Sequence, residues 1–323
     1  MMLNIKKILL GVDFPKPALP EVHQAATLAR HFNSEIVMVH AVTEQSHAVG
    51  VPDDPAEFAG WDMFSEIRRE ASKNLDQSLG PELEGLAIRS MLLKGDPAQA
   101  ILQTAQVENA DLIMMASHGY TFDRFLQGSV TAEVLHGSEC PVWTGAYIEE
   151  AEGSQTPNSP RFLYGGASVR DKQLMAANRQ GWKQQPMQEF ALRNILCAVD
   201  LGPRSEKAVS RAAAMAAEFG AHLTLAHVTA SVELWGPGGD YDNQKWKEEL
   251  VGDASREMSK LQQDMGTKAD VIINSGDVPT MLRQAATQTK ADLLVTGCYP
   301  YGGNLRIHGY AIICAVSIPV LSV

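Results

Sequence analysis

The chain has 323 residues and a formal net charge of −11, with 45% hydrophobic and 20% charged residues. This length accommodates two domains of ordinary size, each with its own core. The negative charge argues against a general nucleic-acid binder and against a protein held on an anionic membrane, because both need a basic surface. No apolar run reaches the length of a membrane span, so we expect no such span and a cytoplasmic location.

Short apolar runs of strand length alternate with segments of helical periodicity along residues 1–147. The runs typical of buried strands are 7–12, 35–42, 87–93, 112–116 and 140–143. Apolar residues recur at helical spacing in 22–32, 64–75 and 98–106, and a further helix begins at Gly128. This alternation predicts an α/β fold with a parallel sheet covered by helices on both faces.

The same order of segments recurs in the second half of the chain. Residues 110–112 (Ala-Asp-Leu) are repeated as residues 291–293, and Gly128 corresponds to Gly309, both 181 positions further along. An internal repeat of this length predicts two similar domains, 1–147 and 193–323. Residues 148–192 are polar and contain several prolines, and we interpret them as a linker or insertion.

An anion-binding site is predicted where strand 112–116 ends. Gly119 lies in the loop that follows, and Gly128 and Ser129 open the next helix. The first turn of a helix has unpaired N–H groups and the positive end of the dipole, and glycine lets the backbone approach a phosphate closely. Ligands of such sheets bind beyond the carboxyl ends of the strands, where the strand order reverses.

These motifs resemble those of a tandem universal stress protein. The resemblance is carried by KILLGVD and NILCAVD, GDP and GDV, ADLIMMASHG and ADLLVTG, and GSVTAEVLHGSECPV, and it covers nearly everything except residues 148–192. It implies two tandem doubly wound domains, each a five-stranded parallel sheet of order 3-2-1-4-5, and dimers joined through strand five. With both domains in one chain, we predict an internal pseudo-dimer in which the strands at Val142 and Val320 hide each other's edges. Whether two such chains associate further is left open.

ATP-binding members of the family carry the pattern G-x2-G-x9-G-[ST]. The matching residues in the first half are Ala116, Gly119, Gly128 and Ser129. The first glycine is therefore an alanine, and eight residues instead of nine separate Gly119 from Gly128. In the second half the matching positions are Gly297, Pro300, Gly309 and Tyr310. Since Pro300 has no N–H to offer a phosphate and Tyr310 replaces the hydroxyl residue by a bulky ring, we expect the first half to hold the better preserved site.

Carried onto this chain, the resemblance predicts an adenine pocket at the ends of the first two strands. Asp13 accepts hydrogen bonds from the adenine or ribose, and its counterpart is Asp200; an aspartate here is also typical of a turn or helix cap. Backbone groups of Val39, His40 and Ala41 line the pocket. His40 matches His227 in the second half, which indicates a structural or pocket-lining role for both.

The phosphates are expected beside Ala116, at Gly119, Gly128 and Ser129, and at Val130, the first apolar position of the helix. The alternative is a turn glycine and an ordinary N-cap serine. Within the loop, Arg124 and His118 are placed to reach a phosphate. Arg124 is also typical of a solvated surface group, and the sequence places no carboxylate or nucleophile beside His118 for acid–base chemistry.

The predicted function is a stress-response protein that binds and senses an adenine nucleotide, ATP, with Mg²⁺ present only together with the nucleotide. The alternative is an interaction or scaffold protein of the same fold without a nucleotide, which the shortened loop and Pro300 favour. Enzymatic hydrolysis lacks a general base or metal motif, and no P-loop or dinucleotide-binding motif occurs. The four cysteines lack metal-ligand spacing and are typical of small core residues in a reducing compartment.

Overall fold

The computed structural model describes residues 3–12, 19–42, 80–116, 130–145, 191–203, 205–229, 239–297 and 306–323. The helix predicted over 64–75 and all but the last two residues of the predicted linker lie outside these ranges. Within the described ranges, no helix combines the length and the apolar character that crossing a membrane requires.

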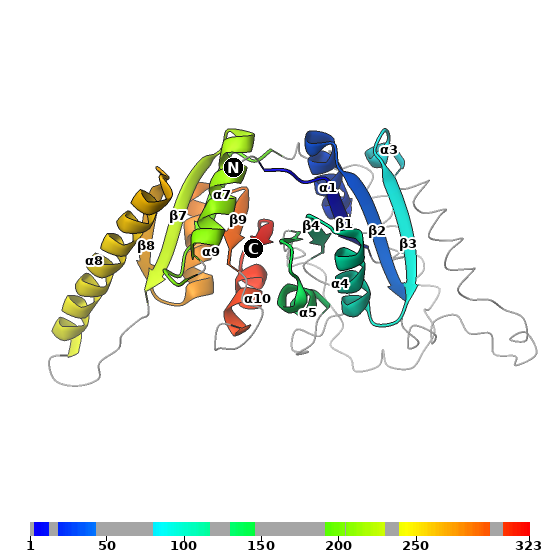
Figure 1. The fold of residues 1–323 in the computed structure, drawn as a ribbon. Helices are drawn as coiled ribbons and strands as arrows, with labels where there is room; N and C mark the ends of the chain where they lie inside the picture. The colour runs from blue at the N-terminus through cyan, green and yellow to red at the C-terminus, as the bar shows by residue number, and fades with distance from the viewer. Residues whose placement is uncertain are drawn as a thin grey trace, which may run out of the picture.

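The described strands form one ten-stranded sheet in the order β3-β2-β1-β4-β5-β10-β9-β6-β7-β8, with the two halves side by side (Figure 1). The first half contributes β1 (Lys7–Gly11), β2 (Glu35–Val42), β3 (Ile88–Lys94), β4 (Leu112–Met115) and β5 (Val142–Thr144). The second contributes β6 (Asn194–Ala198), β7 (His222–Thr229), β8 (Asp270–Ser275), β9 (Leu293–Thr296) and β10 (Val320–Ser322). Each half is parallel with the order 3-2-1-4-5, so the predicted fold class is confirmed.

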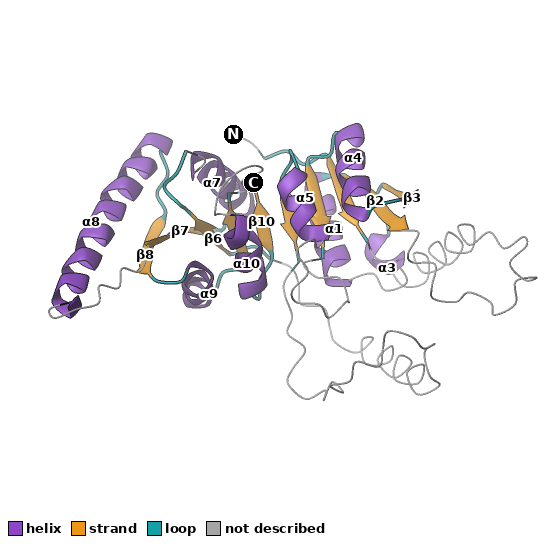
Figure 2. Cartoon of the chain, turned by 90° about the horizontal axis from the view of Figure 1, so that it is seen from below, coloured by secondary structure: helices purple, strands orange, loops and turns teal. Residues whose placement is uncertain are grey.

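Helices cover both faces of the sheet (Figure 2). One face carries α1 (Leu19–Phe32), α3 (Gly80–Leu83), α7 (Ser205–Phe219) and α8 (Gly239–Met265). The other carries α4 (Pro97–Glu108), α5 (Val130–Gly137), α9 (Val278–Thr289) and α10 (Arg306–Ala315). Alternate strand residues point to opposite faces: Ile8 and Leu10 lie in the first core, and Leu9 lies in the second. Both cores extend through the two halves. Because the strands are covered on both faces, their sequences are apolar runs without polar alternation.

The repeated Ala-Asp-Leu motif has a structural cause. The carboxylate of Asp111 accepts the N–H groups of Lys6 and Lys7 at 2.7 and 3.0 Å. Asp292 accepts those of Arg193 and Asn194 at 2.7 and 2.8 Å. The aspartate before the fourth strand of each half therefore fixes the start of the first strand, which is its neighbour in the sheet.

The repeated Gly-Asp pair also has a local explanation. Gly95 and Gly276 have φ of 131° and 147°, a region that side-chain-bearing residues rarely adopt. The next residues, Asp96 and Asp277, cap helices α4 and α9 by accepting N–H groups of their first turns at 2.8 and 3.1 Å. These residues turn the chain from the third strand into the following helix.

The two halves join through β5 and β10, which pair antiparallel with Trp143 opposite Leu321. Both residues are nearly fully buried, and the Thr144 hydroxyl donates to the carbonyl of Val320 at 3.3 Å. Helices α1 and α7 also meet, because the ring of His31 stacks on Phe219 with centroids 4.5 Å apart. The predicted internal pseudo-dimer is therefore confirmed, and the inner edge of each half is covered.

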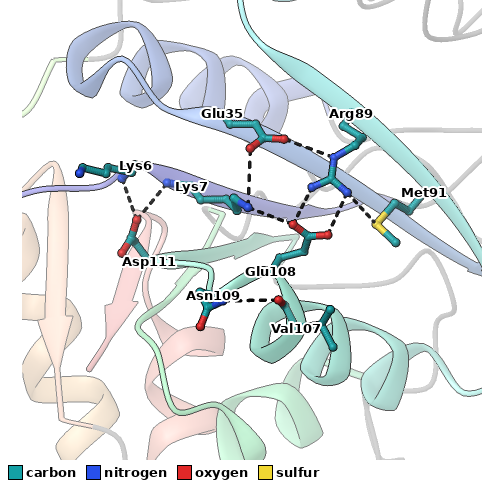
Figure 3. A network of polar contacts seen from close by, with 9 residues as sticks. All are labelled: Lys6, Lys7, Glu35, Arg89, Met91, Val107, Glu108, Asn109 and Asp111. Carbon is teal, nitrogen blue, oxygen red and sulfur yellow. Dashed lines mark hydrogen bonds and ion pairs between the residues drawn. The ribbon is translucent and has the colours of Figure 1, made fainter.

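Charged side chains cluster at the amino-terminal ends of the first three strands (Figure 3). Arg89 of β3 makes a two-pronged contact with Glu108 of α4 at 2.8 and 2.6 Å, and Lys7 of β1 lies 2.9 Å from the same carboxylate. Hydrogen bonds from Arg89 and then Lys7 lower the pKa of Glu108 to about 2. The network lies at the opposite end of the strands from their carboxyl termini, so its role is to tie β1, β3 and α4 together.

Helix α8 departs from the sequence-based expectation at one position. Apolar residues recur every four positions in the sequence of this helix, at Trp246, Leu250, Ala254 and Met258, and this spacing predicts one buried face. The structure buries Ala254 and Met258, yet the exposed fraction of Trp246 is 51%. The helix has 27 residues and spans about 40 Å, whereas the six residues of β8 span about 20 Å. The periodicity therefore gave the right face, but Trp246 belongs to a part of α8 that is not fully covered.

Candidate functional site

The candidate site lies beyond the carboxyl ends of β1, β2 and β4. Strands β1 and β4 are parallel neighbours, with Leu10 opposite Met114. From β1 the sheet continues to β2 and β3, and from β4 it continues to β5, so the strand order reverses between β1 and β4. The connections leave in opposite directions at such a point, and a crevice forms there.

At the end of β2, the three residues predicted to line an adenine pocket differ in their surroundings. The carbonyl of Val39 accepts the N–H of Val12 at 2.9 Å, and its side chain is buried in the core. The ring Nδ1 of His40 lies 3.0 Å from the carbonyl oxygen of Val12, so Nδ1 carries the proton in that contact. Val39 is the last residue of β2 that pairs with β1, and Ala41 lies two residues further along. Its backbone therefore extends beyond the ladder with β1, while on its other side it still pairs with Leu93 of β3.

At the end of β4, Ala116 is held against the start of α5. Its carbonyl accepts the hydroxyl of Thr131 at 3.3 Å. Val130, the first residue of α5, is half-buried against the core, and the carbonyl of Met115 accepts the N–H of Gly145 at 3.0 Å. The first turn of α5 is thus fixed next to the end of β4, as an anion site at a helix N-terminus requires.

The ends of β2 and β4 are two strand spacings apart, about 10 Å. The structure thus brings Ala41 and Ala116 to one edge of the sheet, on either side of β1. The other predicted contacts, Asp13, His118, Gly119, Arg124, Gly128 and Ser129, lie outside the described residues. Their roles stay predictions.

The second half repeats this framework, and there the aspartate after the first strand is described. His227 Nδ1 lies 2.7 Å from the carbonyl of Val199, as His40 does with Val12. Asp200 accepts the N–H of Gly202 at 3.0 Å and the hydroxyl of Ser205 at 2.8 Å. The alternative of a turn and helix start therefore describes the contacts of Asp200. Pro300 and the side chain of Tyr310 lie outside the described residues.

The residue after the fourth strand is small in both halves, Ala116 in the first and Gly297 in the second. Among the described residues, no atom lies within 4 Å of a Cβ atom added at Gly297. Residues 298–305, which follow it, lie outside the described ranges.

Sequence reasoning missed two residues near this edge. Thr131 follows the Gly-Ser-Val segment directly, and its hydroxyl is the group that ties α5 to Ala116. Glu21, in the first turn of α1, is only 7% exposed and lies against Gly145. The available signal was position, since Glu21 precedes the buried Gln24 and Leu28 by three and seven residues, on one face of the helix.

The described residues offer little for metal or thiol chemistry. They contain no group of three or more histidine, cysteine or acidic side chains able to hold a metal ion. Burial raises the pKa of the Cys197 thiol to about 12 and also raises that of Cys140. Both thiols are therefore protonated at neutral pH and are poor nucleophiles.

The fold and this edge define a tandem doubly wound α/β protein with a crevice at each reversal of strand order. The family model described as "Universal stress protein family" matches residues 4–144 and 191–307. A universal stress protein of Methanocaldococcus jannaschii is 31% identical over 140 residues, which are 42% of this chain and 79% of that protein. Universal stress protein A homolog 2 of Coxiella burnetii is 32% identical over 146 residues, 44% of this chain and 94% of its own. The chain belongs to the universal stress protein family.

The full arrangement of two halves also occurs in a solved structure. A universal stress protein from Archaeoglobus fulgidus matches 99% of this chain with 97% of its own, at a TM-score of 0.60 and 17% sequence identity. At that identity the likeness concerns the fold alone.

Proposed function

We propose that this protein binds an adenine nucleotide, ATP, at the carboxyl edge of its first half and acts as a stress-response sensor. The observation that carries the proposal is the bond from the Thr131 hydroxyl to the Ala116 carbonyl, which sets the N-terminus of α5 beside the end of β4. The phosphates are assigned to that helix N-terminus, and the adenine to the backbone of Ala41. Mg²⁺ would accompany the phosphates.

The proposed mechanism is binding, without turnover. Occupancy would stabilise the segment between β4 and α5, and partner proteins would respond to that change. Ligand that binds only the folded chain stabilises it by about 2.7 kcal/mol at roughly one hundred times the dissociation constant. The preference for the first half rests on the contacts of Asp200, which are taken by its own turn, and on Pro300 in the matching loop.

The test is calorimetric titration of the full chain with ATP, with and without Mg²⁺, using Ala116→Leu and the matched variant Gly297→Leu. A leucine at 116 fills the end of β4, where the phosphates are assigned. Gly297→Leu introduces the same side chain at the end of β9, where a Cβ atom meets no described atom within 4 Å. We expect one ATP per chain, at least about tenfold weaker binding in Ala116→Leu, and unchanged binding in Gly297→Leu.

A loss confined to Gly297→Leu would assign the site to the second half. If millimolar ATP gives no heat of binding and no rise in the melting temperature, the second candidate is favoured: an interaction or scaffold protein without a nucleotide. The loop between Gly119 and Gly128, one residue shorter than the family pattern, is the observation that supports this candidate. Turnover of ATP in the same samples would contradict the proposal of binding without catalysis.

A further inference from the structure

A buried carboxyl group lies against the end of β5, the strand through which the two halves join. Glu21 is 7% exposed, and its Oε2 atom has no hydrogen-bond partner among the described residues. The side chain lies directly on the backbone of Gly145: a Cβ added there would be 2.6 Å from Cδ and 2.7 Å from Cγ of Glu21. Glycine at 145 is what makes room for the carboxyl group.

Gly145 connects the joint to the candidate site. It follows β5, the strand that pairs with β10, and its N–H bonds to the carbonyl of Met115 beside Ala116. One turn further along α1, the side chain of Gln24 accepts the indole N–H of Trp143 at 2.8 Å. The first turns of α1 are therefore attached to β5 by one side-chain hydrogen bond and by the packing of the Glu21 carboxyl group, whose Oε2 atom has no partner among the described residues.

The second half has an apolar pair in the equivalent place. Ala208 occupies the position of Glu21 in α7, and Val323 occupies that of Gly145 after β10, with its N–H on the carbonyl of Thr296. Both are buried in the shared core. The fold thus tolerates an uncharged contact here, and only the first half carries an acid.

The environment of Glu21 disfavours its charged form. Burial raises its pKa from 4.5 to about 7, and a backbone hydrogen bond offsets this in part. Titratable or charged groups on α1 and the elements around it are His23, Arg30 and His31 on α1, Lys7 on β1, Glu35 and His40 on β2, Glu82 on α3, Asp111 before β4, and Arg211 and Glu218 on α7. No nearby charge appears among the causes of the shift, which are burial and the backbone bond.

We propose that Glu21 makes the joint between the two halves sensitive to pH. The protonated side chain stays packed on Gly145. The ionised side chain moves into water, because a buried unpaired carboxylate is costly, and the first turn of α1 separates from the end of β5. Since Gly145 is bonded to Met115, the opening extends to the end of β4.

The expected size of the effect follows from the two protonation equilibria. If the open state has the ordinary pKa of 4.5 and the packed state a pKa of about 7, the opening constant rises about 20-fold between roughly pH 5.5 and 7.5. The proposal does not depend on a bound nucleotide, so it can fail or hold separately from the proposed function.

Hydrogen exchange of the full chain tests the proposal, with rates corrected for the intrinsic effect of pH. In the wild type, we expect protection of the segments 142–145 and 320–323 to fall about 20-fold from about pH 5.5 to 7.5. Their protection should stay below that of β7 throughout this range, because β7 exchanges only when the whole chain unfolds. In Glu21→Gln this pH dependence should disappear. The matched control is Glu206→Gln, which removes an exposed carboxylate from the first turn of α7 and should behave like the wild type.

Three results would overturn the proposal: the same pH dependence in Glu21→Gln, constant protection of both joint segments in the wild type, or protection of the joint segments equal to that of β7 at every pH, which would show that they open only when the whole chain unfolds. An NMR titration of the glutamate side chains in the wild type gives an answer that needs no variant. An apparent pKa for Glu21 near its ordinary 4.5 would contradict the inference directly.

Discussion

The contact between Glu21 and Gly145 gives a prediction about packing that uses the second half as its template. Gly145→Val adds a Cβ atom that would be 2.6 Å from Cδ and 2.7 Å from Cγ of Glu21, far inside normal contact. Moving the glutamate aside costs about 1–3 kcal/mol, as overpacking of a core usually does. The backbone at 145 does not have a positive φ, so valine brings no conformational strain of its own.

The same valine should be tolerated once the glutamate is removed. Glu21→Ala with Gly145→Val recreates the buried pair formed by Ala208 and Val323. We expect the cost of Gly145→Val to fall by about 2 kcal/mol in the Glu21→Ala background, a coupling typical of residues in direct contact. Glu21→Ala alone should change the free energy of unfolding by less than about 1 kcal/mol. It leaves a cavity, which destabilises the fold, but it also removes a buried carboxyl oxygen without a partner among the described residues, which offsets that cost.

The assay is a double-mutant cycle from urea unfolding at about pH 5.5, where Glu21 is mainly protonated. Gly137→Val is the matched control, since its Cβ would collide with Leu102 of α4 and not with Glu21. Its cost should be the same with and without Glu21→Ala. Additive costs for Glu21→Ala and Gly145→Val would refute the reasoning, because they would mean that the two side chains do not compete for one space.

Two further predictions concern pH and strand anchoring. Because the pKa of Glu21 rises from 4.5 to about 7 on folding, its contribution to stability is full below pH 4.5 and is lost as the pH rises to about 7. At about 1.4 kcal/mol for each tenfold change this comes to about 3 kcal/mol. Urea unfolding of wild type and Glu21→Gln should therefore diverge by that amount across this window, and a constant difference would contradict it. Asp111→Ala removes the acceptor of two N–H groups at the start of β1 and should cost about 2 kcal/mol. Asp292→Ala should cost the same, and a loss below about 0.5 kcal/mol in either would show that water replaces the carboxylate.

Several features of the fold were predictable because their causes are local. Each first strand ends where its apolar run ends, and Gly95 with Asp96 marks the turn and cap that the structure contains. The repeat also bears on how the two halves join, which the sequence of one domain alone does not show. Two copies in one chain, together with the family resemblance that implies dimers joined through strand five, predicted that β5 and β10 cover each other's edges.

The candidate site was only partly predictable. The sequence placed Val39, His40 and Ala41 at the end of β2, but the register of the sheet separates them: the Val39 carbonyl is used by the ladder, and Ala41 lies beyond it. For Asp200 the sequence allowed both a nucleotide contact and a turn or helix cap. The structure shows the contacts of a turn, with the Ser205 hydroxyl 2.8 Å from the carboxylate, and that contact depends on how the chain folds back into α7.

The sequence by itself determined the architecture of this protein: an internal repeat, parallel strands between helices, and an aspartate or glycine at each turn. Those features arise from periodicity and short-range hydrogen bonds, which are written along the chain. Only the tertiary structure decided which polar side chains are buried and against what. In the sequence, Glu21 is an ordinary acid in the first turn of a helix. Its position on Gly145, more than one hundred residues away, is set by the packing of α1 across the sheet, and that packing gives the group its raised pKa.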